Sequence, residues 1–343
     1  MVSTPQREIY SDPFAVRTAE EFSRLLAANP KDPVFIGRLG GSDFEAVAQS
    51  RSKIRHFFLA PISAVGKVLS LPRRVPYVPP FSSQHRANVR ALNGYFDADD
   101  SKDNYRKYLE TMRSAYLETR VFTYATRHTQ DAIDKGVVTH PSLTFLESVS
   151  KGKKLFTYSF IELVDPFVLS MHSWASRRKV LVVSPFSKSV EFQWTRRSEL
   201  LMNSTYPKMH LSTYTTPVTY SSSRRPKKKP VQAQTSNWNT ELERIKNEVL
   251  KLDFDFALLS CASYAMPLGL AIERSGRSAI YVGGALNPMF NVYGERFAKL
   301  PYSLLVNPKT TIDAIELSEL DQIREGRTHP NEALRAYIRN TNK

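Results

Sequence analysis

The chain has 343 residues, of which 41% are hydrophobic and 11% aromatic. This is enough apolar material for a full core, so general disorder is excluded. Lys and Arg number 48 against 33 Asp and Glu, and the resulting formal charge of +15 predicts anionic partners: nucleotides, phosphorylated sugars, anionic lipid or nucleic acid.

Cys261 is the only cysteine, which excludes a disulfide framework and a cysteine-rich zinc site. No stretch reaches the ~18 consecutive apolar residues of a membrane span. Residues 1–14 lack the apolar segment of a signal peptide. We therefore expect a cytoplasmic protein.

Residues 1–51 are expected to form the first part of an α/β domain. A helix is predicted over 18–29, where Thr18 and Glu21 form a capping-box pattern. A short apolar run over 33–41 predicts a strand that ends in a turn, and a second helix is predicted over 42–50.

Residues 52–150 are predicted to be a mainly helical insertion that covers one side of the sheet. The segment 71–81 is proline-rich and extended, whereas 85–126 is largely helical in pattern. Aromatic and Met residues at helical spacing, Tyr105, Tyr108, Met112 and Tyr116, indicate a packing stripe.

Residues 151–343 complete the α/β domain. Continuous apolar strands are predicted over 179–186, 254–263 and 278–285, with a helix over 265–276 that is closed by a C′ glycine. Buried, non-alternating strands joined by helices indicate a mostly parallel, Rossmann-like sheet with helices on both faces.

A basic, proline-bounded segment over 219–236 is predicted to be a mobile loop of this domain. It could close over a diphosphate, contact anionic lipid or be solvated. Lysines beside an anionic membrane each add roughly 1 kcal/mol of attraction, so the segment is suited to peripheral membrane contact.

In open α/β sheets, ligands bind outside the carboxyl ends of the strands. The candidate binding residues are therefore those that follow each predicted strand. They are found in four turns, over residues 38–45, 184–189, 260–267 and 282–288.

The first turn combines glycines with carboxylates. Gly40 and Gly41 allow close approach of a ligand, and the helix that begins at Ser42 offers free N–H groups to an anion. Asp43 and Glu45 would repel a phosphate unless a divalent cation lies between them, and Mg²⁺ and Mn²⁺ take such oxygen ligands. Ser42 and Glu45 also match a capping box, and the two interpretations are compatible.

The other turns offer polar, aromatic and glycine residues for a nucleotide or sugar. Each also has a structural interpretation: a helix cap at Ser187, a helix start with Pro267, and a tight turn at the paired glycines. The candidate residues are Ser184, Phe186, Ser187, Lys188, Ser263, Tyr264, Gly283, Gly284 and Asn287.

Common catalytic motifs are absent from the sequence. There is no Walker loop, no G-x-G-x-x-G, no H-E-x-x-H and no G-x-S-x-G, and the seven histidines have no metal-like spacing. These absences disfavour dinucleotide dehydrogenases, P-loop kinases, zinc proteases and serine hydrolases.

Three segments resemble the GT-D type glycosyltransferases. FIGRLGGSDFEAV (35–47) is similar to the Arg-x-Gly turn and Asp-x-Glu-like motif of that family, and KVLVVSPFSKSVEFQ (179–193) follows in the same order. The block over 235–297 is similar to the family's late block, in which a Pro-Leu helix ending in Gly leads to an Ala-Ile-x-x-Gly-Gly strand. One departure is that Gly41 and Ser42 separate the first glycine from the acids, which follow it directly in many relatives.

The resemblance implies a Rossmann-like fold and a nucleoside-diphosphate sugar donor, UDP- or GDP-linked. It places a Mn²⁺ or Mg²⁺ ion at Asp43 and Glu45, with Arg38 beside the phosphates. The expected reaction moves the sugar to an acceptor hydroxyl that is glycan, lipid-linked or protein-linked.

An inverting reaction also needs a base for the acceptor hydroxyl. Asp165 and Glu162 are candidates because they are expected to precede a strand. Two other classes stay open, a basic nucleic-acid-binding module and an S-adenosylmethionine-dependent Rossmann-like protein. We expect no nucleic-acid partner, because the basic residues are spread along the chain and no RNA or DNA motif occurs.

Overall fold

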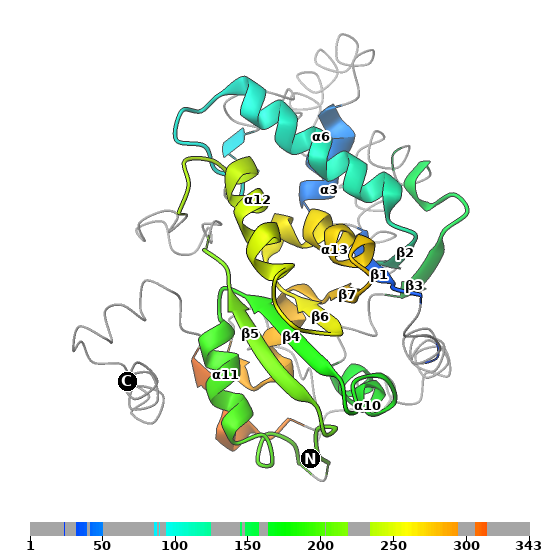
Figure 1. The fold of residues 1–343 in the computed structure, drawn as a ribbon, viewed down its shortest axis with the longest axis vertical. Coiled ribbons are helices and arrows are strands. Elements are labelled where there is room, and N and C mark those ends of the chain that lie inside the picture. The colour runs from blue at the N-terminus through cyan, green and yellow to red at the C-terminus, as the bar shows by residue number, and fades with distance from the viewer. Residues whose placement is uncertain are drawn as a thin grey trace, which may run out of the picture.

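The protein is an α/β structure built on one parallel sheet (Figure 1). A computed structural model describes residues 24, 32–39, 42–50, 86–87, 89, 94–124, 145, 148–157, 164–202, 204–218, 234–293 and 306–313. The helix predicted over 18–29, the proline-rich segment 71–81 and most of the basic segment 219–236 lie largely outside these residues.

The described strands of the main sheet are β1 (Phe35–Leu39), β2 (Val121–Tyr124), β3 (Lys154–Thr157), β4 (Lys179–Ser184), β5 (His210–Thr215), β6 (Phe256–Leu259) and β7 (Ser278–Tyr281). The longer helices are α3 (Ser42–Ser50), α6 (Lys102–Glu118), α10 (Val164–Trp174), α11 (Ser187–Thr195), α12 (Trp238–Val249) and α13 (Ala265–Arg274). A short helix, α14 (Leu286–Met289), follows β7, and β8 (Val292–Tyr293) pairs with β9 (Ile312–Asp313) in a second sheet.

The main sheet has the order β3-β2-β1-β7-β6-β4-β5, and every pairing is parallel. This confirms the predicted α/β class with a parallel sheet. β7, the last strand of the main sheet in chain order, lies at its centre, where Phe35 pairs with Ala279 and Leu259 with Tyr281.

Helices cover both faces of the sheet, as the apolar strands predicted. In β4, Val180 and Val182 belong to one buried cluster, whereas Leu181 and Val183 belong to another. The first cluster includes apolar residues of α10, α11 and α14, and the second includes those of α3, α6, α12 and α13 (Figure 1). We call these two sides the α10 face and the α13 face.

The face on which a connecting helix lies depends on the direction in which the chain crosses the sheet. Connections that move toward β3 place their helices α3, α12 and α13 on the α13 face. Connections that move toward β5 place α10 and α11 on the α10 face. The described crossovers therefore share one hand, as parallel strand–helix–strand units require.

The prediction that 85–126 is largely helical is wrong at its end. α6 stops at Glu118, with Thr119 as an extended C-cap, and residues 121–124 form β2 beside β1. The run Val-Phe-Thr-Tyr is rich in β-branched and aromatic residues, which fit a buried strand better than a helix. The segment 52–150 thus contributes one strand to the main sheet as well as α6.

An aromatic cluster joins α6 to the α13 face. Tyr105 and Tyr108 pack with Tyr95, and the Tyr108 ring meets Trp238 of α12 edge-on at 4.6 Å between centroids. Trp238 in turn stacks on Tyr264. The predicted packing stripe of α6 is therefore part of the main core.

Within the described residues, no helix is both long enough and apolar enough to cross a membrane.

Candidate functional site

Four turns that the sequence singled out follow four neighbouring strands. They come after β1, β7, β6 and β4, which are adjacent in that order and parallel. Their carboxyl ends therefore form one continuous edge of the sheet. The structure brings together the turns that lie far apart in the chain.

The chain leaves β1 and β7 toward opposite faces. After β1 it enters α3, whose Phe44 and Val47 pack on the α13 face. After β7 it enters α14, whose Leu286 and Met289 pack on the α10 face. Such a divergence between neighbouring parallel strands opens the crevice in which ligands of α/β sheets bind.

Arg38 and Gly283 meet at this divergence. Arg38 is half-buried near the end of β1, and Gly283 begins the turn after β7 with φ +62°. A β-carbon built on Gly283 would lie 2.9 Å from Nη1 of Arg38. Only glycine both adopts this backbone readily and leaves room for the guanidinium.

Asn287 adds a buried polar atom to the turn after β7. Its side chain is 8% exposed, and no donor within the described part of the chain reaches its Oδ1 atom. A buried acceptor without a donor is costly. Asn287 is therefore suited to a ligand that brings an N–H or O–H group.

The turn after β4 is largely satisfied by its own contacts. The Oγ atom of Ser184 accepts from the Phe186 N–H at 3.1 Å, and the Ser187 hydroxyl bonds that of Thr215. Phe186, and not Ser187, is the N-cap of α11, and it makes no side-chain cap bond. The Lys188 ammonium pairs with Glu191 at 2.7 Å, so part of its charge is already offset.

The turn after β6 is part of the core. The Trp238 indole donates to the Ser263 Oγ atom at 2.8 Å. Tyr264 is 1% exposed, and its ring stacks on Trp238 with 5.3 Å between centroids and 6° between planes. These contacts hold α12 against the sheet, and they do not present Ser263 or the Tyr264 ring to a nucleotide base.

The predicted metal motif lies at the same edge. Asp43 and Glu45 are in the first turns of α3, directly after the carboxyl end of β1. Gly40 and Gly41 lie outside the described residues, as do the side chains of Ser42, Asp43 and Glu45. Positions two residues apart on an α-helix do not face each other, so α3 by itself does not bring positions 43 and 45 together.

Elsewhere in the described ranges, His, Cys, Asp and Glu form no group of three or more that could hold a metal ion. Carboxylate oxygens are the ligands that Mg²⁺ and Mn²⁺ take, so the residue types at 43 and 45 fit such an ion.

The context expected for Asp165 is wrong. It does not precede a strand, since it lies in the first turn of helix α10, which packs on the α10 face. The run Val-Leu-Ser-Met that follows it was compatible with a strand, but the pattern continues as a helix to Trp174. Glu162 lies outside the described residues, as does the side chain of Asp165.

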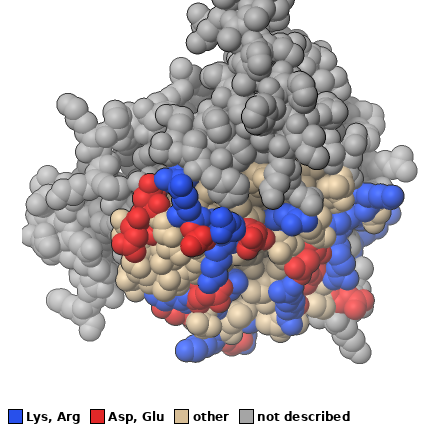
Figure 2. Space-filling model, turned by 90° about the horizontal axis from the view of Figure 1, so that it is seen from above, with Lys and Arg blue, Asp and Glu red and all other residues tan. Residues whose placement is uncertain are grey.

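Charges of both signs occur on one described face of the protein. Figure 2 shows Lys and Arg intermingled with Asp and Glu over the described part of one face. This face does not carry the single-sign basic patch that is typical of nucleic-acid binding.

No family model, curated protein or solved structure matches the chain.

The contribution of α12 to this edge of the sheet was not predicted from the sequence. Trp238 and Glu241 are fully buried in it, and both take part in polar contacts near the carboxyl edge. Two features of the sequence could have predicted this helix. Asn237 is a favourable N-cap residue, and its side chain accepts a hydrogen bond from the Thr240 N–H. Trp238, Leu242 and Ile245 then follow at a helical spacing of apolar residues.

Proposed function

We propose that the protein is a glycosyltransferase that moves a sugar from a nucleoside-diphosphate sugar to an acceptor hydroxyl with a divalent cation. The proposal agrees with the resemblance to GT-D type glycosyltransferases. The observation that carries it is the position of Arg38, whose guanidinium lies against Gly283 where the chain leaves β1 and β7 toward opposite faces.

Charge supports a diphosphate at this place. A guanidinium binds phosphate oxygens through charge-assisted hydrogen bonds. Asp43 and Glu45 lie in the first turns of α3, directly after β1. Carboxylates can lie beside a diphosphate when a divalent cation bridges the carboxylates and the phosphates. Asn287 Oδ1 supplies an acceptor for a ribose or sugar hydroxyl, or for a base N–H.

In the proposed reaction, the acceptor oxygen forms a bond to the anomeric carbon while the bond from that carbon to the diphosphate oxygen breaks. Arg38 stabilises the negative charge that grows on the leaving diphosphate. Asp43 and Glu45 would hold the cation, which supplies Lewis-acid stabilisation of the same charge when bound. The acceptor proton passes to a base or to solvent.

Titration calorimetry with UDP and GDP, with and without Mn²⁺, tests the proposal. We expect Mn²⁺-dependent binding of at least one nucleotide by the wild-type protein. Arg38→Ala should weaken it by about 10- to 150-fold, the factor expected for charge-assisted hydrogen bonds. Arg106→Ala is the matched control, because Arg106 lies exposed on α6, where its guanidinium pairs with Asp103.

Asp43→Asn should remove the Mn²⁺ dependence. Since positions 43 and 45 do not face each other on α3, Asp43→Asn and Glu45→Gln should have unequal effects. Absence of nucleotide binding with Mn²⁺, or an Arg38→Ala variant that binds like the wild type, would contradict the proposal.

A further inference from the structure

The amino edge of the main sheet, opposite the carboxyl edge that holds the candidate site, is rich in Lys and Arg. All the strands of this sheet are parallel, so the residues that lead into them come together along one edge. These residues form the segments 32–34, 117–120, 151–154, 177–179, 208–210, 251–255 and 273–278. The segments hold eleven Lys and Arg against five Asp and Glu, in less than a tenth of the chain.

Backbone contacts hold the basic residues at the β4 and β5 end of this edge side by side. The Arg177 N–H donates to the Lys208 carbonyl at 2.6 Å, and the His210 N–H donates to the Arg178 carbonyl at 3.0 Å. Lys179 pairs in register with His210. The side chains of Arg177, Lys179 and Lys208 are exposed, so their charges face solvent.

A second basic group lies at the β3 end. Lys151 and Lys154 are exposed, and the Lys154 N–H donates to the Arg120 carbonyl at 3.2 Å. The Lys153 ammonium donates to two carbonyls in the last turn of α6. Because β3 and β5 are the outer strands of the sheet, basic residues lie at both ends of its amino edge (Figure 1).

Ion pairs within the amino edge leave its positive excess in place. They are Lys179–Asp253, Arg120–Glu273 and Arg274–Glu118. Each pair offsets one charge of each sign, so the excess of six positive charges is unchanged.

The carboxyl edge has no such excess. Its four candidate turns hold Arg38 and Lys188 against Asp43 and Glu45, which balance. The two ends of the strands therefore differ in charge. A negatively charged plane attracts the amino edge and leaves the carboxyl edge facing away from it.

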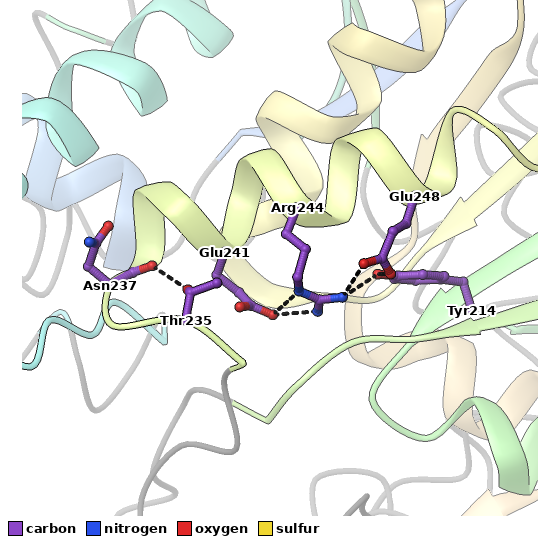
Figure 3. Close-up of polar contacts among 6 residues, drawn as sticks. All are labelled: Tyr214, Thr235, Asn237, Glu241, Arg244 and Glu248. Carbon is purple, nitrogen blue, oxygen red and sulfur yellow. Dashed lines mark hydrogen bonds and ion pairs between the residues drawn. The ribbon is translucent and has the colours of Figure 1, made fainter.

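The charges on α12 are neutralised within the protein. Figure 3 shows Arg244 between two acids of the same helix. Arg244 donates to Glu241 at 2.5 Å and to Glu248 at 2.8 Å. Glu248 also accepts from the Tyr214 hydroxyl at 2.8 Å. This group adds little to an external field, so it does not weaken the contrast between the two edges.

Exposed aliphatic side chains also lie at the amino edge. Leu117 and Leu252 are each 38% exposed, in the connections that lead to β2 and β6. The Leu117 carbonyl accepts from Lys153 at 2.5 Å and the Leu252 carbonyl accepts from Arg277 at 2.9 Å. Each leucine thus lies beside a basic residue.

The kind of apolar residue favours lipid over nucleic acid. Basic residues mixed with exposed aliphatic ones are typical of surfaces that lie on anionic membranes. Surfaces for single-stranded nucleic acid present aromatic rings on which bases stack. In the described ranges, the large apolar side chains that are exposed include no aromatic ring.

We propose that the amino edge of the sheet is a docking surface for an anionic lipid bilayer. Its Lys and Arg side chains lie against the negatively charged headgroups, with Leu117 and Leu252 at the interface. Docking in this way directs the carboxyl edge away from the membrane. Each basic residue beside such a surface contributes roughly a fivefold gain in affinity.

Flotation of the 343-residue chain with vesicles tests the inference. One set of vesicles is phosphatidylcholine alone, and the other is an equal mixture of phosphatidylcholine and phosphatidylserine. We expect binding to the mixed vesicles only, and weaker binding as the salt concentration rises. An edge variant combines Lys151→Gln, Lys154→Gln and Lys208→Gln. It should bind about 100-fold more weakly, since three contributions of roughly fivefold are lost.

The matched control combines Lys102→Gln, Arg106→Gln and Lys107→Gln, which removes the same charge from exposed positions in the first half of α6. α6 reaches the amino edge at Glu118. At a rise of 1.5 Å per residue, the three control positions lie about 16 Å or more from that end, beyond the Debye length of about 8–10 Å. The control should bind like the wild type.

Three results would overturn the inference. The first is a wild-type chain that does not bind the mixed vesicles. The second is an edge variant that binds as tightly as the control, which would place the lipid contact elsewhere, for example in 219–236. The third is binding to a labelled single-stranded oligonucleotide that only the edge variant loses, without binding to vesicles, which would assign the edge to nucleic acid.

Discussion

The Nη1 atom of Arg38 occupies the space that a side chain at Gly283 would need, 2.9 Å from the position of its β-carbon. The two residues lie 245 positions apart in the chain and meet because β1 and β7 are neighbours in the sheet. The glycine thus controls where the guanidinium can lie.

Gly283→Ala should lower both stability and nucleotide affinity. A left-handed backbone costs a non-glycine residue about 1–2 kcal/mol, and the new methyl group would displace Arg38. Urea unfolding and calorimetry with UDP and Mn²⁺ measure the two effects.

Gly276→Ala is the matched control, since Gly276 also has a positive φ, +84°, but a β-carbon there meets nothing within 4 Å. It should lose similar stability and keep its affinity. Equal affinities in the two variants would show that the Arg38 contact does not matter for binding.

Gly269→Ala should destabilise the protein although alanine favours helices. A β-carbon at Gly269 of α13 would overlap the ring of Phe35 in β1. Overpacking of this kind costs about 1–3 kcal/mol, more than the gain of about 1 kcal/mol in helix propensity. Thermal and urea unfolding measure the change.

A double-mutant cycle with Phe35→Leu identifies the cause. The smaller side chain should reduce the cost of Gly269→Ala relative to its cost in the wild-type background. Strictly additive effects would place the strain elsewhere in α13.

Ser263→Ala should reduce stability without reducing nucleotide affinity. It leaves the buried Trp238 indole N–H without its acceptor at 2.8 Å, a loss of about 1–3 kcal/mol. Ser275→Ala, which removes a more exposed hydroxyl bonded to Ile272, should change stability less. A Ser263→Ala variant with normal stability and weakened nucleotide binding would instead support the ligand-binding role that the sequence predicts for Ser263.

The free energy of unfolding should depend on the ionisation of Glu248. Burial opposes ionisation of this carboxyl group, but the hydrogen bonds from Arg244 and Tyr214 outweigh it, so its pKa lies below the usual 4.5. A lowered pKa in the folded state contributes stability above about pH 4.5, and that contribution is lost as the pH falls through the folded value.

Glu248→Gln should therefore be less stable than the wild type near neutral pH, and the difference should shrink in acid. Urea midpoints measured from about pH 7 to about pH 3.5 follow this difference. A difference that stays constant over the range would exclude linkage to Glu248.

Patterns that are local in the sequence predicted much of the fold. The apolar runs at 179–186 and 278–285 correspond to β4 and β7, each followed by a turn. The C′ glycine of α13 was also correct, since Gly276 has φ +84°. Each of these features depends on a few residues that are neighbours in the sequence, so a short segment is enough to predict it.

The order of the strands in the sheet could not be predicted from such local patterns. The position of β7 between β1 and β6 depends on pairs such as Ile36 with Ile280, which lie more than 240 residues apart. The same limit applies to Ser263 and Tyr264, which look like a polar turn in sequence. Their partner Trp238 comes from a helix 25 residues upstream, and no local pattern indicates that contact.

The central place of β7 also governs how the chain can assemble during synthesis. β1, β2 and β3 form one half of the sheet and β4, β5 and β6 the other, and within the described chain only β7 pairs with both halves. The first half thus leaves the ribosome with the inner edge of β1 uncovered until Tyr281 has emerged. Non-local pairing of this kind is slow and exposes strand edges, so we expect the chain to be prone to aggregation until β7 has been synthesised.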